Sequence, residues 1–456
     1  MEKQIKMEDM VNYCKNYGFI FQGSEIYGGL ANTWDYGPLG ARLKNNLKDA
    51  WRYYFIQLND KAYEVDADLL MHPTVWKASG HLASFSDPLL DCKECKRRVR
   101  ADNLIEDFDE NAKPDLMTYE EMSEFIKKHQ IPCPSCGKCN FTEIRDFNLM
   151  FQTKRGVTEG SENTIYLRPE NAQGEYVNYL NVLRSMRTSI PFAIGQVGKA
   201  FRNEITPGNF TFRTIEFEQM EFQNFVKPGT DMKFYEDYKK IAKDFFLSVG
   251  LDEDKMRYKD HDKLAHYAKA ACDIEYKFPF GWGEINGTHN RTDFDLKNHQ
   301  EYSKISHEYL EVDTKERYIP YIVESTIGVD RFFLAVLFNS LKIEDLDGEE
   351  RLILKIKPSL APITVNVFPL VKKYHSEKAS EIYNDLKKHF MASYDEAGNI
   401  GKRYRRSDAI GVPFVVTIDD ETLNNDEVTV RFRDTMEQEK VKVSDLEAFI
   451  KKHLEG

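Results

Sequence analysis

The segment Phe201–Phe222 combines charged and aromatic side chains with the alternation expected of two short strands. Because the side chains of a strand point alternately to its two faces, Arg202 and Glu204 share one face of the first strand. A polar turn at Thr206–Asn209 predicts a hairpin connection. The second strand gathers four side chains on one face: Arg213, Phe217, Gln219 and Glu221. Such a surface suits a ligand with a phosphate, a flat ring and an ammonium group, although a solvated amphipathic hairpin shows the same alternation.

Two arginines are candidates for binding phosphate. A guanidinium group stays charged and donates two parallel hydrogen bonds, which suits a phosphate held in a fixed orientation. Arg202 lies in the predicted hairpin, and Arg331 lies in the first turn of a helix, where free N–H groups also favour anions. Phe217 could stack a base, a contact of about 1–3 kcal/mol. Taken singly, a strand arginine is usually a surface cation and a phenylalanine usually belongs to the core.

Four glutamates form a second group of candidates: Glu170, Glu221, Glu284 and Glu324. If several of them meet at one pocket, their carboxylates repel one another unless a cation sits between them. An amino group or Mg²⁺ would supply that cation. The competing interpretation is that each glutamate is an ordinary surface charge.

The cysteines have the spacing of a metal site. Five of the seven form two groups, Cys92-x-x-Cys95 and Cys133-x-x-Cys136, with Cys139 close behind. Each pair presents two thiolates to one tetrahedral ion, so the two pairs predict a structural zinc site. Free thiols are the alternative, and Cys139 is either a spare thiol or a competitor for the fourth position. Sparse cysteines in odd number favour a reducing compartment.

Length and composition are those of a protein with two or three domains, at 456 residues and 53.2 kDa. No apolar run approaches the ~20 residues of a membrane span, and the start lacks the apolar region of a secretory signal, so we expect a cytoplasmic protein. A net charge of −12 argues against indiscriminate nucleic-acid binding. The basic run Lys402–Arg406 is either a local RNA contact or a solvated loop.

The first three quarters of the chain mix helices and strands. An amphipathic helix at Ala41–Leu58 precedes a strand at Ala62–Leu70, and this pair is either a subunit interface or ordinary core. Residues at about 86–160 resemble an insertion, with an acidic helical stretch at Asp102–Gln130. Further strands are expected at Thr164–Leu167, Phe192–Phe201 and Tyr318–Ser325, and helices at Asp231–Ser248, Asp260–Ala271 and Phe332–Phe338.

The last quarter has the alternation of a separate α/β module. The charged stretch Leu346–Pro358 predicts a linker before it. The expected strands are Ile363–Val367, Phe414–Ile418 and Val428–Phe432, and the expected helices are Ser376–Phe390 and Ser444–Leu454.

Together these segments resemble the three motifs of class II aminoacyl-tRNA synthetases. The segment Phe201–Phe217 resembles motif 2, Gly328–Phe332 resembles motif 3, and the helix and strand ending at Pro73 resemble motif 1, the dimer element. More closely, the chain resembles the single-chain, homodimeric bacterial glycyl-tRNA synthetases over nearly its full length. The segments that carry this resemblance are Phe21–Gly29, Trp34–Pro38, Phe217–Glu221, Gly401–Tyr404, Ile410–Phe414 and Arg433–Met436.

The resemblance implies an α+β fold in which an antiparallel sheet is flanked by helices. The catalytic domain would span 1–358, with the cysteine-bearing insertion at about 86–160, and an α/β anticodon-binding domain would span 359–456. The implied activity is that of a glycine–tRNA ligase, which activates glycine with ATP and transfers it to the 3′ end of tRNA(Gly). The implied partners are ATP with Mg²⁺, glycine, tRNA(Gly) and a second copy of the chain, with no membrane.

The resemblance also assigns roles to individual residues. Arg202 and Arg331 would be catalytic, holding the α-phosphate and the γ-phosphate, while Phe217 stacks the adenine. The implied ATP site comprises Arg202, Asn203, Glu204, Phe212, Arg213, Thr214, Ile215, Glu216, Phe217, Glu284, Ile285, Gly328, Val329, Asp330 and Arg331. The implied glycine site comprises Arg100, Glu170, Phe217, Glu218, Gln219, Met220, Glu221, Glu324, Ser325, Thr326, Ile327 and Gly328. The implied zinc ligands are Cys92, Cys95, Cys133 and Cys136.

One segment departs from the family pattern. Glu324-Ser325-Thr326 stands where the family usually has Glu-Pro-Ser, so a hydroxyl is kept and a methyl is added beside the α-carbon of the substrate. Two other functions stay open from the sequence. One is a class II synthetase for alanine or serine, and the other is a non-catalytic RNA-binding paralogue, against which the presence of both Arg202 and Arg331 argues.

Overall fold

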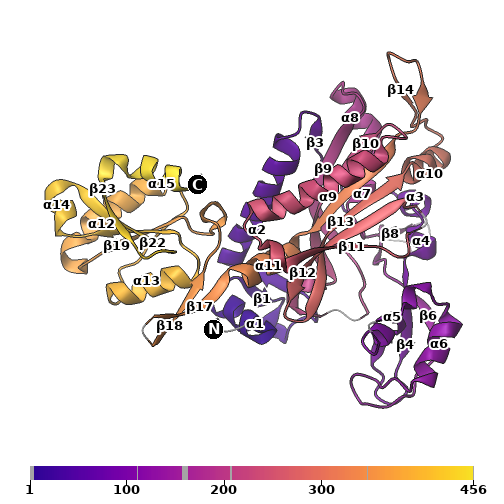
Figure 1. Cartoon of the computed structure of the whole chain (residues 1–456), viewed down its shortest axis with the longest axis horizontal. Helices are drawn as coiled ribbons and strands as arrows, with labels where there is room; N and C mark the ends of the chain where they lie inside the picture. The colour runs from indigo at the N-terminus through magenta and orange to yellow at the C-terminus, as the bar shows by residue number, and fades with distance from the viewer. Residues whose placement is uncertain are drawn as a thin grey trace.

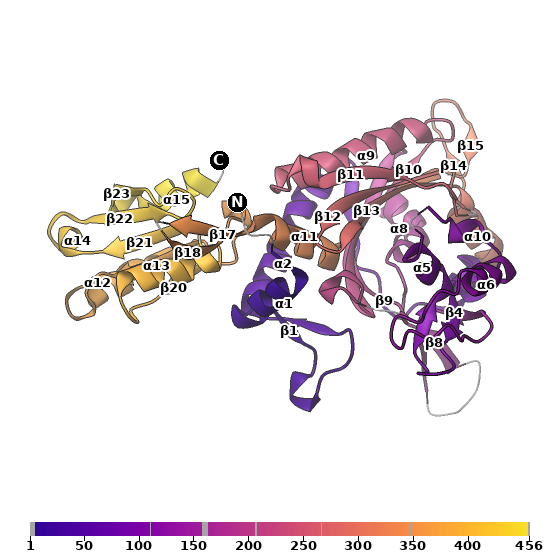
Figure 2. The same ribbon diagram turned by 60° about the horizontal axis from the view of Figure 1, so that its bottom comes forward.

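The structure of the chain is a computed structural model that describes residues 5–109, 111–156, 163–205, 208–265, 267–346 and 348–454. A large N-terminal body built on one sheet is joined, near β17 and β18, to a smaller C-terminal body (Figure 1). The cysteine-bearing segment forms a separate lobe on the side of the sheet away from the C-terminal body (Figures 1 and 2). Among the described residues, no helix combines the length and the apolar character that crossing a membrane requires.

A seven-stranded sheet organises the N-terminal body, in the order β11-β12-β13-β16-β10-β9-β3. Neighbouring strands are antiparallel except for β3 and β9, which run parallel. The predicted antiparallel sheet is therefore confirmed. The strands are β3 (Ala62–Glu64), β9 (Phe192–Phe201), β10 (Glu216–Val226), β11 (Met256–Asp260), β12 (Ala270–Phe278), β13 (Gly281–Thr292) and β16 (Tyr321–Gly328).

Three long helices cover one face of this sheet and enclose the main apolar core: α2 (Pro38–Trp51), α9 (Asp231–Ser248) and α11 (Val329–Ser340). Figure 2 shows α9 lying along the sheet. Met220 and Phe222 of β10 and Ile327 of β16 are fully buried in this core. Because side chains alternate along a strand, the residues between them point to the opposite face of the sheet.

Helices cover one end of the opposite face. There α7 (Ala172–Val177), α8 (Tyr179–Ser185) and α10 (Phe294–Ser303) pack on apolar strand residues, among them Phe192 and Phe225. Beyond this cover the same face becomes polar. The smaller elements around the sheet are α1 (Met7–Asn16), β1 (Ile20–Gln22), β2 (Trp34–Tyr36), a π-helical turn at Arg52–Gln57, α3 (Pro73–Ala78), α4 (His81–Ser84), β7 (Gln152–Lys154), β8 (Thr164–Tyr166), β14 (Tyr309–Leu310) and β15 (Arg317–Tyr318).

The insertion is a compact lobe with its own sheet and its own core. The strand order is β5-β4-β6, and a small apolar cluster that includes Leu104, Met122 and Ile126 joins this sheet to two helices. The helical stretch predicted at Asp102–Gln130 is thus two α-helices, with a 3₁₀ turn at Pro114–Leu116 between them. The elements are β4 (Ser86–Asp91), β5 (Arg98–Arg100), α5 (Ala101–Glu106), α6 (Tyr119–Lys128) and β6 (Arg145–Asn148).

The C-terminal body is a five-stranded mixed sheet in the order β20-β19-β21-β22-β23. Strand β19 runs parallel to β20 and β21, as expected of strands connected through helices, so the predicted α/β module is confirmed. The elements are β19 (Val365–Pro369), α12 (Lys372–Leu386), β20 (Ala392–Tyr394), α13 (Ile400–Ala409), β21 (Phe414–Ile418), α14 (Asp420–Asn425), β22 (Glu427–Phe432), β23 (Gln438–Lys442) and α15 (Leu446–Leu454).

Two predictions about the elements are wrong. The stretch Leu346–Pro358 is not a plain linker, because it contains β18 (Glu349–Leu354), which pairs with β17 (Leu341–Leu346). Arg351 of β18 is buried and donates to Asp408 of α13 at 2.9 Å, which ties this hairpin to the C-terminal body. The helix predicted at Asp260–Ala271 is absent from its described residues, since strands β11 and β12 occupy its ends and pair with each other, and sheet pairing outweighs helix propensity.

Candidate active site

Rows of side chains run across the polar face of the central sheet. Glu221 of β10 lies opposite Thr326 of β16, which in turn lies opposite Gly287 of β13. In the neighbouring row, Glu324 lies opposite His289. The pocket above these rows is lined by Glu170, Arg202, Glu204, Thr211, Phe212, Arg213, Thr214, Phe217, Glu218, Gln219, Glu221, Tyr267, Glu284, Gly287, His289, Arg291, Glu324, Thr326, Gly328, Asp330 and Arg331.

Three of the predicted glutamates meet at one end of this pocket. Glu221 and Glu324 rise from neighbouring strands, and Glu170 reaches the pocket from the loop before α7. Glu221 and Glu324 are buried, and the Glu170 side chain is only 15% exposed. Sequence reasoning predicted this convergence, although no spacing along the chain links the three residues.

The three carboxyl groups differ in charge. Burial raises the pKa of Glu221, and the neighbouring Glu324 and Glu170 raise it further, so this carboxyl keeps its proton well above the usual range. Burial also opposes ionisation of Glu324, but Arg291 and His289 together outweigh it and lower the pKa of Glu324 to about 2. Burial is likewise outweighed at Glu170, where His81 is the main group that lowers the pKa. The site therefore holds two carboxylates and one proton that an incoming cation could displace.

Arg291, on β13, contacts this acidic site and was not predicted to do so. It donates from Nη1 to Oε2 of Glu324 at 2.8 Å and from Nε to Asp295 at 2.9 Å, and its guanidinium lies 4.3 Å from the centre of the Tyr267 ring. It is 3% exposed. The only signal in the sequence is the pairing of Arg291 with Asp295 four residues later, which many surface segments share.

A second set of unpredicted contacts positions Glu170. Gln173 donates to Oε1 of Glu170 at 3.0 Å, and Nε2 of His81 lies 3.6 Å from the same oxygen. Nδ1 of His81 is 2.7 Å from the hydroxyl of Ser79. Since His81 is separated from Glu170 by the whole insertion, no local pattern could have revealed this contact.

The other half of the pocket suits a nucleotide. The guanidinium of Arg202 lies 5.3 Å from the centre of the Phe217 ring, and its Nε donates to the carbonyl of Pro169 at 3.1 Å. Arg331 donates to the carboxylate of Glu284 at 2.8 Å and lies 4.5 Å from the centre of the Phe212 ring. Two arginines and an aromatic face thus border one space, as predicted.

The predicted hairpin that carries these residues is only partly right. Glu216–Val226 is a strand, and Phe217, Gln219 and Glu221 share the pocket face as expected. The first strand ends at Phe201, however, so Arg202 and Glu204 lie in the connection and on no strand face. The backbone leaves the sheet because Asn203 N–H donates to the carbonyl of Leu149.

The connection is longer than the predicted tight turn. A 3₁₀ turn at Phe210–Phe212 follows Gly208, which bridges to Arg213. Thr206 and Pro207 of the predicted turn lie outside the described residues.

Several predicted ligand contacts do not line the pocket. The side chains of Met220, Ile285, Ile327 and Val329 are buried in the core on the far face, so only their backbone is available to a ligand. Ser325 is buried too and accepts from Asn286 at 3.1 Å. Asn203, Ile215 and Glu216 flank the lining residues without belonging to them. The roles of these residues stay predictions.

Asp330 and Glu218 line the pocket, but their carboxylates already accept hydrogen bonds from other groups of the protein. The carboxylate of Asp330 accepts from Lys44 at 2.8 Å, from the hydroxyl of Tyr36 at 2.5 Å and from the backbone N–H of Glu218 at 2.7 Å. Lys48 donates to the carboxylate of Glu218 at 3.0 Å. These contacts fix the start of α11, and with it Arg331, against α2.

Arg100 lies in the insertion and is not among the lining residues. It donates to Asp87 at 2.8 Å and forms a two-pronged contact with Asp102. Its guanidinium is therefore already satisfied by two carboxylates of the insertion, and its contact with substrate stays a prediction.

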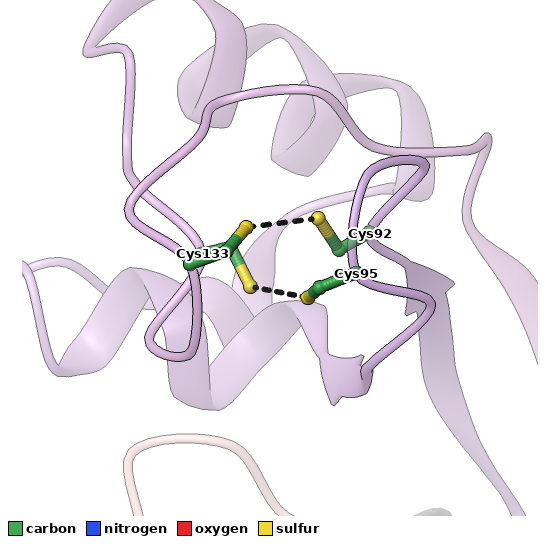
Figure 3. Close-up of side chains that lie close together, drawn as sticks. Cys92, Cys95 and Cys133 are labelled. Atoms are coloured by element: carbon green, nitrogen blue, oxygen red, sulfur yellow. Dashed lines mark hydrogen bonds between the residues drawn. The ribbon is translucent and has the colours of Figure 1, made fainter.

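The two cysteine pairs come together at one end of the insertion. The four sulfur atoms lie within 4.8 Å of one another, with Cys92 3.6 Å from Cys136 and Cys95 3.7 Å from Cys133. Figure 3 shows Cys92 and Cys95 facing Cys133 across a short gap. A tetrahedron with zinc–sulfur bonds of about 2.3 Å has sulfur–sulfur separations of about 3.8 Å, so the four cysteines fit zinc. Cys139 is exposed and outside this group.

The basic run Lys402–Arg406 lies on helix α13, not in a solvated loop. Arg403 is buried and donates to the carbonyl of Pro369 at 2.8 Å, so it holds the helix to the sheet. Lys402 and Arg406 are exposed, and Arg406 pairs with Asp395. Only part of the run is therefore available to a polyanion.

Comparison with known proteins agrees with this architecture. Residues 151–340 match the family model of the tRNA synthetase class II core domain (G, H, P, S and T), and residues 364–453 match that of the anticodon binding domain. The chain is 53% identical to the glycine–tRNA ligase of Caldanaerobacter subterraneus subsp. tengcongensis over 460 residues, covering 100% of both chains. It is 52% identical to that of Bacillus cereus, covering 98% of this chain and 99% of the relative, and 51% identical to that of Clostridium acetobutylicum over the full length of both.

Proposed function

This chain belongs to the glycine–tRNA ligase family of class II aminoacyl-tRNA synthetases, and we propose that the pocket on the polar face of its central sheet is where glycine is activated. The enzyme is an aminoacyl-tRNA ligase that joins glycine and ATP as glycyl-adenylate and transfers the glycyl group to the 3′ end of tRNA(Gly).

The observation that carries this placement is the pairing of two unlike half-sites in one pocket. At one end Glu170, Glu221 and Glu324 supply negative charge for an ammonium group. At the other end Arg202, Phe217 and Arg331 supply cations and a ring for phosphates and a base. Glycyl-adenylate carries all of these groups, and it is short enough to bring its ammonium close to its phosphate.

The reaction needs positioning more than proton transfer. The carboxylate of glycine attacks the α-phosphorus of ATP, and pyrophosphate leaves. Arg202 would hold the α-phosphate and stabilise the charge of the transition state, while Arg331 would hold the γ-phosphate of the leaving group. The terminal ribose hydroxyl of the tRNA then attacks the activated carbonyl and releases AMP. No side-chain nucleophile is required.

Selection of glycine would rest on Thr326. Its hydroxyl donates to Oε1 of Glu324 at 2.9 Å, which fixes the orientation of the side chain. A methyl group beside the α-carbon of the substrate would exclude any amino acid with a side chain, and steric exclusion rejects larger substrates more strongly than added contacts can select for them.

Two metals would serve this enzyme. Mg²⁺ would enter with the phosphates of ATP, and the carboxylate of Glu284, already beside Arg331, is a ligand of the kind that Mg²⁺ prefers. Zinc would be held by Cys92, Cys95, Cys133 and Cys136 and would stabilise the insertion, because its four sulfur atoms already have near-tetrahedral spacing.

We further infer the domain boundaries and the assembly. The catalytic domain would span 1–358, including the insertion at about 86–160, and the anticodon-binding domain would span 359–456. Two copies would pair through the motif 1 region, where Leu69 and Leu70 are exposed apolar residues between β3 and α3. The homodimer would act in the cytoplasm, where ATP and tRNA are found.

Aminoacylation tests this function. Purified protein, ATP and labelled glycine should charge a tRNA(Gly) transcript and leave tRNA(Ala) and tRNA(Ser) transcripts uncharged. Charging of tRNA(Ala) with alanine or of tRNA(Ser) with serine would support a different class II specificity, and the absence of any charging would support a non-catalytic paralogue.

A further inference from the structure

A cluster of two histidines and an aspartate lies beside the pocket, which only His289 of the three lines, and has no part in the chemistry above. His289 lies on β13, Asp273 on β12, and His261 directly after β11. Asp273 lies opposite Gly287, and the backbone of His261 donates to the carbonyl of Ala271, the residue opposite His289. Three neighbouring strands thus bring these side chains together, although they are far apart in the sequence.

The ligand atoms have the spacing of a metal site. One nitrogen from each histidine and one oxygen of Asp273 all lie within 4.8 Å of one another. Nε2 of His261 is 2.8 Å from Oδ2 of Asp273, and the two imidazole rings are 5.9 Å apart between centres. Imidazole nitrogens with one carboxylate form a donor set that suits Zn²⁺ and neighbouring transition metals, and three protein ligands leave a position for water.

Gly287 keeps the space between these ligands open. A Cβ atom at this position would lie 3.4 Å from Nε2 of His289 and 3.5 Å from Oδ1 of Asp273. Both ligand atoms therefore border the volume that glycine leaves free. A side chain here would press on the histidine ring, whose Cε1 would lie 3.2 Å from that Cβ.

The other nitrogen of His289 makes no hydrogen bond among the described residues and lies near a carboxylate. Nδ1 is buried and lies 3.5 Å from Oε1 of Glu324. A histidine that binds a metal through one ring nitrogen usually directs the N–H of the other toward a carboxylate, which fixes the tautomer and orients the ring. Glu324 stands where such a carboxylate is needed.

We propose that His261, Asp273 and His289 bind one divalent transition-metal ion of the Zn²⁺ class, at a site separate from the four cysteines. The ion would add positive charge next to Glu324 through His289. Since Glu324 is the proposed partner of the glycine ammonium, the ion would weaken glycine binding. This consequence rests on the proposed function, whereas the metal site itself does not.

Cobalt substitution separates the two sites. The full-length protein, stripped of metal and titrated with Co²⁺, should take up two equivalents. The cysteine site should show thiolate-to-cobalt charge-transfer absorption, and the second site should show only the weaker d–d bands of nitrogen and oxygen ligands. Asp273→Asn and His261→Ala should each abolish the second equivalent, and Cys92→Ser should abolish the charge-transfer absorption alone. His389→Ala, an exposed histidine of α12's C-terminal flank, is the matched control and should keep both.

Uptake confined to the cysteine site, or a second equivalent that survives in both His261→Ala and Asp273→Asn, would overturn the site. His261 is exposed, so its replacement leaves the fold intact even if Asp273→Asn disturbs the sheet. In a second arm, Zn²⁺ should raise the glycine KM about fivefold, as expected for a unit charge acting over several ångströms near the surface. Metal binding without any change in glycine KM would keep the site and overturn the assignment of Glu324 to glycine.

Discussion

The guanidinium of Arg291 lies 2.8 Å from Oε2 of Glu324, and both side chains are buried on the polar face of the central sheet. This pair explains how an acid can stay ionised inside the protein. Arg291→Met should leave Glu324 buried without its cation, at a cost of about 3–5 kcal/mol in the free energy of unfolding. It should also raise the glycine KM far more than the ATP KM.

Denaturant unfolding and separate glycine and ATP saturation curves measure both effects. Arg317→Met, on β15 outside the pocket, is the matched control and should change neither. Equal increases in the two KM values would contradict the assignment of Arg291 to the glycine half of the site.

Arg202→Ala should lower glycine-dependent ATP–pyrophosphate exchange at least ~100-fold, because it removes a positive partner of the developing charge on the α-phosphate. Arg202→Lys should recover only part of this loss, since an ammonium group lacks the planar fork of guanidinium. Near-normal exchange in Arg202→Ala would be incompatible with the proposed role.

Glycine binding should release a proton from Glu221. Burial raises the pKa of this carboxyl, and nearby Glu324 and Glu170 raise it further, while an arriving ammonium group favours the ionised form. The glycine KM should therefore fall as pH rises toward the pKa of Glu221 in the free enzyme.

The same shift has a consequence for stability. The folded-state pKa of Glu221 lies above its unfolded value, so its contribution to stability is complete below the unfolded pKa and is lost as pH rises through the folded pKa.

Calorimetric titration with glycine in two buffers of different ionisation heat measures the proton that Glu221 should release when glycine binds. Equal heats in both buffers, or a heat difference that persists in Glu221→Gln, would refute the release of a proton from Glu221 on glycine binding.

Zinc should depend on the paired cysteines and not on Cys139. Cys92→Ser should remove about one equivalent of bound zinc, that of the cysteine site, and destabilise the insertion, whereas the matched variant Cys139→Ser should bind as much zinc as the wild type, because Cys139 lies outside the four-sulfur group. Metal analysis of purified protein decides this point, and a zinc-free wild-type protein with full activity would remove zinc from the account.

The exposed cations of α13 should act on tRNA alone. Replacing Lys402 and Arg406 with alanine should weaken tRNA charging and its dependence on salt, and leave ATP–pyrophosphate exchange unchanged, since adenylate formation needs no tRNA. Arg403 should be left unchanged, because it is buried and holds the helix to the sheet. Loss of both activities together would indicate that the run is structural.

Strong local patterns predicted the fold well. The helix Asp231–Ser248 and the strand Phe192–Phe201 have the bounds that the sequence predicts, because each has a clear apolar period and a distinct end. The helix predicted at Asp260–Ala271 is wrong because the conformation of this stretch follows from pairing between β11 and β12. Such a contact between segments is not reflected in helix propensity.

The residues of the site likewise include some that the sequence could predict and some that it could not. Arg202, Phe217 and Glu221 could be predicted from one segment and its resemblance to a known motif. Arg291 and His81 could not, since each acts through a carboxylate that is distant in sequence and near in space. The residues that set the charge of a pocket carboxylate are thus harder to predict than the carboxylate itself.

ATP–pyrophosphate exchange measured with each of the standard amino acids tests the central claim most directly, because it isolates adenylate formation in the proposed pocket. We predict exchange with glycine and none above background with alanine or serine, which the methyl group of Thr326 should exclude. Exchange that is equal or faster with alanine or serine, or no exchange with glycine, would contradict the assignment of this pocket to glycine activation.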